Sequence, residues 1–206
     1  MKSKLKLVVA TRNKDKLREI KEILKGLDLE ISSLLDYPVS PRIVENGKTF
    51  KENAAKKAMA VSRFTKALTM GEDSGLCVEA LHGRPGVYSS RFAGNSKDDA
   101  KNNRKLLKLL SDLPAGKRKA YYFCAVALAD KDGLVKITEG RCSGRIGLEM
   151  KGHSGFGYDP LFVIPGYKKT FAELGEKIKH KMSHRYRALE KARGIIQKYI
   201  EKHRCA

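Results

Sequence analysis

Apolar residues recur with two different periods along the first part of the chain. Residues 5–10 (LKLVVA) form a short apolar run, which predicts a buried strand. Residues 14–25 then place leucine and isoleucine at helical spacing, and Gly26 is a suitable helix stop. Residues 29–34 (LEISSL) predict a second strand. Strands that alternate with amphipathic helices in this way are typical of an α/β fold.

A second helix is expected after a loop that contains two prolines. Thr49 and Glu52 stand in the T-x-x-E spacing of a capping box, so an alanine-rich helix is predicted from there to about Lys66. Residues 67–70 (ALTM) predict a short strand. The polar and glycine-rich segment 71–75 (GEDSG) is then expected to turn the chain.

The second half of the chain has longer alternating segments. Two long strands joined by the turn sequence DKDG predict a hairpin. The expected elements are a helix opened by Ser96 or Asp99, strands at 120–130, 134–146 and 161–164, and a last helix capped by Ser183. No repeat or linker interrupts residues 1–206, so we predict one domain, with two lobes around a cleft.

The composition restricts the class of protein and of ligand. The chain has 43 basic and 23 acidic residues, a formal net charge of +20, which favours anionic ligands without choosing among nucleic acid, acidic lipid and nucleoside phosphates. Neither a signal peptide nor a membrane-spanning segment is expected, and the localisation predicted is cytoplasmic. The four cysteines form no C-x-x-C pair and are predicted to be reduced, buried and apolar; they are Cys77, Cys124, Cys142 and Cys205.

The turn between the first strand and the first helix is a candidate phosphate site. It carries a hydroxyl, an amide and a lysine in Thr11, Asn13 and Lys16. A helix N-terminus offers free backbone N–H groups and a partial positive charge, both of which suit a polyphosphate. The alternative is an ordinary capped helix start with surface lysines.

Two acidic residues are candidate metal ligands. Glu45 lies in a loop before a helix, and Asp73 follows a short apolar strand. Mg²⁺ prefers oxygen ligands and often takes one or two carboxylates together with substrate phosphates. Alternatively, Asp73 only shapes a turn by bonding to its own backbone.

The segment GFGYDP combines glycines, aromatic rings and a carboxylate. Its glycines permit a close backbone approach, its rings offer flat faces for stacking, and Asp159 offers acceptors to the edge of a base. The alternative is a tight turn with Phe156 in the core.

The last helix begins with residues able to meet a phosphate or a base carbonyl. Lys179 and Arg185 supply donors on either side of the predicted helix start. His180 and His184 are four residues apart, as zinc ligands can be, but neither an H-E-x-x-H order nor a cysteine pair accompanies them. The sequence therefore does not favour a zinc site.

Taken together, these segments resemble the Ham1/ITPase family of inosine and xanthosine triphosphate pyrophosphatases. The matching stretches, in the family's order from residue 8 to about 189, are VVATRNKDKLREI, ENGKTFKENAAKKA, EDSGL, GRPGVYSSRFAG, GFGYDPLF and KTFAEL through KMSHRYRAL. The resemblance implies an ITPase-like α/β fold with two lobes, in which a long curved mixed β-sheet is flanked by helices around a central cleft. It also implies a homodimer that uses Mg²⁺ to hydrolyse ITP, dITP and XTP to the monophosphate and pyrophosphate.

The resemblance further implies a role for each candidate residue. Glu45 and Asp73 would hold the metal, and Asp73 would also act as the catalytic base for water. The residues implied to bind the nucleotide are Thr11, Asn13, Lys16, Lys57 and Ser74 at the phosphates, and Phe156, Gly157, Tyr158, Asp159, Lys179, His184 and Arg185 around the base. Arg12, Glu72 and His153-Ser154 depart from the commoner family residues, which leaves the base preference open.

Three rival functions make different predictions. A nucleic-acid-binding module should show a basic stripe with interleaved aromatics, but the basic residues are dispersed and aromatics are 7% of the chain. We therefore expect a small nucleotide as partner, with no stable nucleic-acid or membrane partner. A Maf-like pyrophosphatase for other modified nucleotides is disfavoured by GFGYDP and SHR. A silent nucleotide sensor is disfavoured because Lys16, Glu45 and Asp73 are all present.

Overall fold

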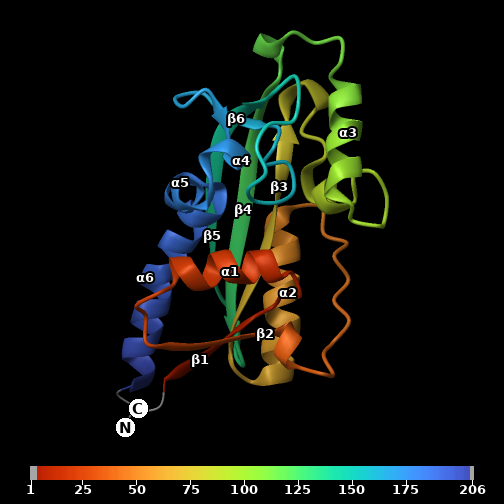
Figure 1. Cartoon of the computed structure of the whole chain (residues 1–206). Helices are drawn as coiled ribbons and strands as arrows, with labels where there is room; N and C mark the ends of the chain where they lie inside the picture. The colour runs from red at the N-terminus through yellow and green to blue at the C-terminus, as the bar shows by residue number, and fades with distance from the viewer. Residues whose placement is uncertain (1–3, 205–206) are drawn as a thin grey trace. The chain divides into compact units, whose positions relative to one another are not determined.

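The computed structural model describes residues 4–204, and its strands form one seven-stranded mixed sheet (Figure 1). The strand order is β2-β1-β3-β4-β5-β6-β7. β1 pairs in parallel with both β2 and β3, whereas the β5–β6 and β6–β7 pairs are antiparallel. The strands are β1 (Leu5–Val9), β2 (Leu29–Ser33), β3 (Leu68–Val78), β4 (Lys119–Asp130), β5 (Gly133–Ile146), β6 (Phe162–Ile164) and β7 (Lys169–Thr170). The predicted α/β class with a mixed sheet is confirmed.

The helices begin largely where the sequence predicts. Asn13 and Thr49 accept hydrogen bonds from the backbone N–H groups of Lys16 and Glu52, and Ser183 accepts one from Tyr186 N–H. The side chain of Glu52 reaches back to Lys48 N–H, one residue before the position expected for a capping box. The helices are α1 (Lys14–Ile23), α2 (Phe50–Thr65), α3 (Asp99–Leu109), α4 (Phe171–Leu174), α5 (Glu176–Met182) and α6 (His184–Arg204). Within residues 4–204, no helix has an apolar stretch long enough to cross a bilayer.

The turn predicted at 71–75 is wrong, because β3 continues through this segment as an eleven-residue strand. Gly71 brings the strand against α2: a Cβ there would lie 2.1 Å from the carbonyl oxygen of Ala54 and 2.6 Å from the backbone nitrogen of Ala58. The carboxylate of Asp73 is bound by side chains of α2, so it can remain in a buried strand. Glycine and charge in this segment therefore serve helix–strand packing.

The start of α3 also differs from the prediction. Asp98, rather than Ser96 or Asp99, caps the helix, with its Oδ1 accepting the N–H of Lys101 at 2.9 Å. Between β3 and α3 the chain forms a short 3₁₀ helix at Gly86–Arg91. Asp99 is thereby placed in the first turn of the helix, where its side chain is available for other contacts.

The chain divides into two compact units. The first comprises residues 1–73, 124–140 and 187–206, and the second comprises 74–123 and 141–186. Consequently β3, β4 and β5 each run from one unit into the other. In the first unit β1 and β2 lie side by side (Figure 1).

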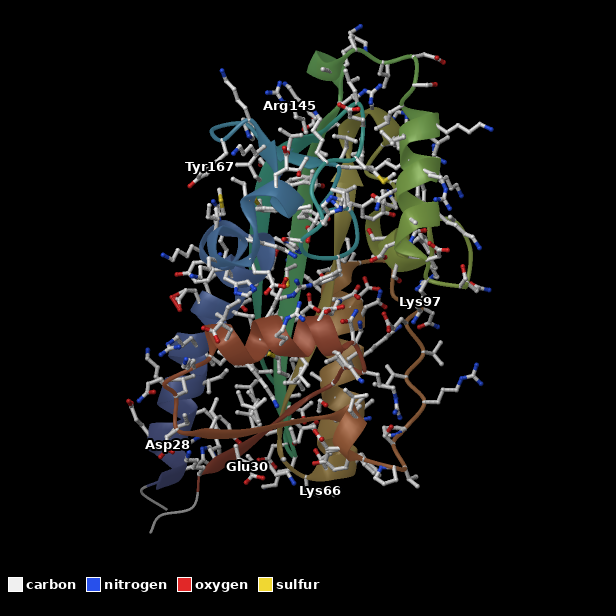
Figure 2. All side chains as sticks on the ribbon, in the orientation of Figure 1. Asp28, Glu30, Lys66, Lys97, Arg145 and Tyr167 are labelled. Atoms are coloured by element: carbon white, nitrogen blue, oxygen red, sulfur yellow. The ribbon has the colours of Figure 1, made fainter. Side chains whose placement is uncertain are left out.

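Each unit has its own apolar core. The first includes a cluster of Val8, Ala10, Leu34 and Val61. The larger cluster of the second contains Leu76, Leu106, Leu110, Tyr122, Tyr158, Phe162 and Phe171 among others. Cys77, Cys124 and Cys142 are buried free thiols, as predicted, and Cys205 lies outside the described residues. Charged side chains such as Lys66 and Lys97, both labelled in Figure 2, are exposed.

Candidate active site

The turn between β1 and α1 carries the first group of predicted site residues. The hydroxyl oxygen of Thr11 accepts the N–H of Asn13 at 3.1 Å, and Asn13 in turn caps the helix. Asn13 is exposed and Thr11 is half-buried. The Nζ atom of Lys16, in the first turn of α1, lies 2.7 Å from Oε2 of Glu72. The helix N-terminus and this lysine together make a cationic place for an anion.

A buried ion cluster joins α2 to β3. The Nζ atom of Lys57 lies 2.9 Å from Oδ1 of Asp73, 2.9 Å from Oε2 of Glu45 and 3.0 Å from the carbonyl oxygen of Glu72. Asn53 donates to the other oxygen of Asp73 at 3.2 Å. Lys57 and Asp73 are buried, whereas Glu45 is exposed. The structure therefore brings together three predicted site residues, Glu45, Lys57 and Asp73.

Burial and charge act in opposite directions on this cluster. Burial raises the pKa of Asp73 above its ordinary value, and the nearby ammonium groups of Lys57 and Lys16 only partly offset this. Burial alone would lower the pKa of Lys57, but the carboxylates of Asp73 and Glu45 outweigh it, so this pKa is raised. Lys57 therefore remains a cation, and Asp73 takes up a proton more readily than an exposed aspartate does.

Glu72 is a member of this cluster to which the sequence prediction gave no role. Its side chain is 1% exposed and its Oε1 accepts a hydrogen bond from the thiol of Cys124 at 3.3 Å, while Oε2 pairs with Lys16. Successive side chains of a strand point to opposite faces, so Glu72 and Asp73 meet two different lysines. The adjacent acidic residues in a predicted strand would have been the signal, had the segment not been interpreted as a turn.

The carboxylates of the first unit fit a divalent cation with oxygen ligands. Among residues 4–204, no three histidine, cysteine, aspartate or glutamate side chains gather as a closed metal site. Glu45 and Asp73 nevertheless converge on one cationic atom, the Nζ of Lys57. Two carboxylates that already share a cation suit Mg²⁺, which completes its shell with water and phosphate oxygens.

In the second unit, two cationic side chains lie near the ring of Phe156. The Nζ atom of Lys179 lies 4.4 Å from the centre of the Phe156 ring, and the guanidinium carbon of Arg185 lies 5.5 Å from it. Both cationic residues are buried, with relative exposures of 2% and 1%. The ring itself is half-buried. A flat ring next to two buried donors is suited to a heterocycle with carbonyl oxygens.

Asp159 organises this group from below the surface. Its Oδ2 accepts the backbone N–H of Phe156 at 3.0 Å and pairs with Lys179 Nζ at 2.6 Å. Tyr122 lies 3.5 Å from the other carboxylate oxygen. Asp159 is 1% exposed, and the hydrogen bonds described for it are to other groups of the protein.

Tyr158 and His184 are core residues. The hydroxyl of Tyr158 donates to the carbonyl oxygen of Ser89 at 2.8 Å, and the backbone N–H of Tyr158 donates to Tyr122 Oη at 3.1 Å. The His184 ring stacks on Tyr122, with centroids 4.5 Å apart. Both residues are 3% exposed. Both residues therefore contact Tyr122 in the interior of the second unit, a position that the aromatic character of the motif did not reveal.

Chain connectivity joins the two groups of residues. Asp73 is the last residue of its segment in the first unit, and Ser74 is the first of the second unit. The hydroxyl of Ser74 accepts a hydrogen bond from the guanidinium of Arg185 at 3.0 Å. The carboxylate of the ion cluster and a contact of the aromatic group are thus carried by neighbouring residues of β3.

Comparison with known proteins places these observations in a family. The Ham1 family model matches residues 7–195. The chain is 48% identical to the dITP/XTP pyrophosphatase of Desulforamulus reducens, covering 94% of this chain and 96% of the relative, and 48% identical to that of Bacillus cereus, covering 97% and 98%. A solved Ham1 protein from Coxiella burnetii superposes with a TM-score of 0.85 at 36% identity, covering 94% of this chain and 99% of the other. The chain therefore belongs to the Ham1 family.

Proposed function

We propose that this protein hydrolyses deaminated purine nucleoside triphosphates, namely ITP, dITP and XTP, to the monophosphate and pyrophosphate. The observation that carries the proposal is the convergence of Glu45 and Asp73 on Lys57, next to the cationic α1 start. The names of the relatives, dITP/XTP pyrophosphatases at 48% identity over nearly the whole chain, support the substrate class.

The phosphate end of the substrate is assigned to the first unit. A triphosphate carries about four negative charges, so its binding site needs several donors and cations. Thr11, Asn13 and Lys16 lie at the N-terminus of α1, where the free N–H groups supply donors and partial positive charge. Lys57 of the first unit and Ser74, the first residue of the second, are the further residues assigned to the phosphates.

Glu45 and Asp73 are the residues that would hold Mg²⁺. When bound there, this ion would neutralise phosphate charge and make the phosphorus atom more open to attack. The fit rests on the two carboxylates that already share one cation in this structure.

Asp73 is assigned the catalytic role. It would orient a water molecule towards the α-phosphorus and accept the proton that this water loses. The new P–O bond forms as the bond to the oxygen bridging the α- and β-phosphorus atoms breaks, and pyrophosphate leaves. Because burial raises the pKa of Asp73 above its ordinary value, this carboxylate is a better proton acceptor than an exposed aspartate.

The base is assigned to the second unit. Phe156 and the loop around Gly157 would receive the purine ring, with Tyr158, Asp159 and His184 supporting them. Hypoxanthine and xanthine carry a 6-keto acceptor, whereas adenine carries a 6-amino donor. Lys179 and Arg185 offer only donors, so adenine would leave a buried donor unpaired, which costs roughly 1–3 kcal/mol. The proposal also includes a homodimer, which the family resemblance implies, and a cytoplasmic location.

A substrate panel tests this function. NMP and pyrophosphate are quantified from ITP, dITP, XTP, ATP, GTP and modified pyrimidine triphosphates, each with Mg²⁺ and with a chelator. We expect ITP, dITP and XTP to be turned over on the order of 10²–10⁴ times more efficiently than ATP, with little product when Mg²⁺ is removed. Equal rates for ITP and ATP would contradict the proposal, and a preference for modified pyrimidines would favour a Maf-like activity.

A further inference from the structure

The peptide groups of Gly157 are held by two side chains of α3. The N–H of Gly157 donates to Oδ2 of Asp99 at 2.7 Å. The carbonyl oxygen of Gly157 accepts a hydrogen bond from Nδ2 of Asn103 at 2.8 Å. Asp99 and Asn103 are four residues apart and therefore lie on one face of the helix. One face of α3 thus occupies both hydrogen-bonding groups of the residue next to Phe156.

Gly157 is a position where such a hold has an effect. Its φ of +67° is in the left-handed region, which favours glycine. Glycine has more backbone freedom than any other residue, so the conformation here is fixed by external contacts rather than by its own side chain. Asp99 and Asn103 provide these contacts from a helix distant in sequence.

The helix is itself firmly anchored in the second unit. Leu106 and Leu110 are fully buried in the core cluster. Asn102 accepts the N–H of Ala93 at 2.7 Å and donates to the carbonyl oxygen of Ser90 at 3.2 Å. The residues that hold Gly157 are therefore carried on a rigid support, which is what a precisely placed binding group needs.

The other residues of the loop are held from a different direction. Asp159 binds the N–H of Phe156, and Tyr122 binds the N–H of Tyr158. Gly157, which lies between Phe156 and Tyr158, is instead bound by α3. If it is lost, Phe156 and its neighbours remain attached, but the backbone beside the ring gains freedom.

We propose that Asp99 and Asn103 are positioning residues that fix the ring of Phe156 beside Lys179 and Arg185 and thereby set the selectivity for the base. This inference rests on the proposed function, in which Phe156 receives the purine. Neither residue touches the substrate. Both act through the peptide groups of Gly157.

The chemistry of the two side chains is not interchangeable. Asp99 must accept, and an asparagine at that position retains an oxygen acceptor. Asn103 must donate, and an aspartate there would direct a carboxylate at a carbonyl oxygen. Asn103 is 3% exposed, and no described residue donates to its buried Oδ1. The amide is thus explained by its donor alone, which points to the Gly157 contact as its purpose.

The test compares variants of this contact in the full chain. D99A and N103A are assayed for kcat and KM with dITP and dATP, beside D99N, F156A and K108A, which changes an exposed lysine on the same helix. We expect D99A and N103A to reduce the preference for dITP by about ten-fold, mainly through KM. D99N should return towards the wild-type preference, and K108A should equal wild type. Hydrogen exchange at the Gly157 amide should accelerate in D99A but not in K108A.

Two outcomes would overturn the inference, and they are distinguishable. If F156A loses the preference for dITP while D99A and N103A keep it, α3 does not position the ring and the proposed function stands. If F156A also keeps the preference, Phe156 does not receive the base, and that part of the proposed function fails together with this inference. D99A changes an exposed side chain outside the core, so its folding can be verified by a thermal melt before the assay.

Discussion

The ion cluster of the first unit and the aromatic group of the second (Phe156, Asp159, Lys179 and Arg185) each contain a buried lysine paired with a carboxylate. In the second, that lysine also lies over an aromatic ring. In the ion cluster, Lys16 and Lys57 are each paired with carboxylates. In the aromatic group, Lys179 is paired with Asp159 and, together with Arg185, also lies over the ring of Phe156. The first arrangement is suited to exchanging charged partners, and the second to presenting donors to a flat, neutral ligand.

Under the proposed function, the two groups would recognise different parts of the nucleotide. A triphosphate that binds Lys16 and Lys57 would displace their carboxylates, and Mg²⁺ held by Glu45 and Asp73 would couple metal binding to nucleotide binding. A neutral base requires no such exchange, because its selectivity depends on the geometry of fixed donors. Substitutions in the two regions should therefore affect different kinetic parameters.

The largest effect is expected from D73N in the ion cluster. Asparagine keeps the shape of the side chain but cannot accept the proton of water, so turnover should fall by about 10³-fold or more. Binding of a non-hydrolysable ITP analogue, measured by calorimetry, should remain detectable. The matched control is D132N, which removes an equal charge from an exposed ion pair. Near-normal turnover by D73N would remove Asp73 from the catalytic role.

The next effect concerns stability in the aromatic group. Asp159 and Lys179 form an ion pair in which both side chains are at most 3% exposed. D159N leaves the buried ammonium without its carboxylate, so the free energy of unfolding should fall by about 3–5 kcal/mol in urea denaturation. E149Q, in an exposed pair with Lys151, should change it by less than about 1 kcal/mol. Equal changes in the two variants would show that the buried pair of Asp159 and Lys179 does not stabilise the folded protein more than an exposed pair does.

The smallest effect is at a tyrosine outside both regions. Burial, followed by the carboxylate of Asp130, raises the pKa of Tyr199 to about 12. A protonated Tyr199 donates to Asp130 Oδ2 at 3.1 Å. Since its unfolded pKa is near 10, the stabilising contribution is complete below pH 10 and is lost as the pH rises towards 12. Y199F should lower stability slightly at pH 8, and its difference from wild type should shrink above pH 10.

Local features were the part of the structure that the sequence predicted well. Thr49 and Ser183 act within their own helix turns, so their predicted capping roles follow from a few neighbouring residues. The hairpin of β4 and β5 follows from alternation and a two-residue turn. The carboxylates and aromatic residues of the site were found through motifs whose order resembles a family.

Contacts between distant segments were the part that could not be predicted. Asp73 remains in a strand because Asn53 and Lys57 of α2 bind it, and no local pattern shows this. The hold of Asp99 on Gly157 spans 58 positions, and the bond from Tyr158 to Ser89 spans 69. Such pairings depend on the packing of the whole unit, which a single sequence does not display.

Gly71 allows the backbones of β3 and α2 to pack in direct contact. The backbone of β3 touches that of α2 at this point, two residues before Asp73, so any side chain there would collide with main-chain atoms that have no room to yield. Even the methyl group of an alanine would push β3 away from α2. This would separate Asp73 from Lys57 without changing the chemistry of either side chain. Position 71 thus fixes the spacing between β3 and α2 near Asp73, and a directed-evolution library for altered substrate range should leave it as glycine.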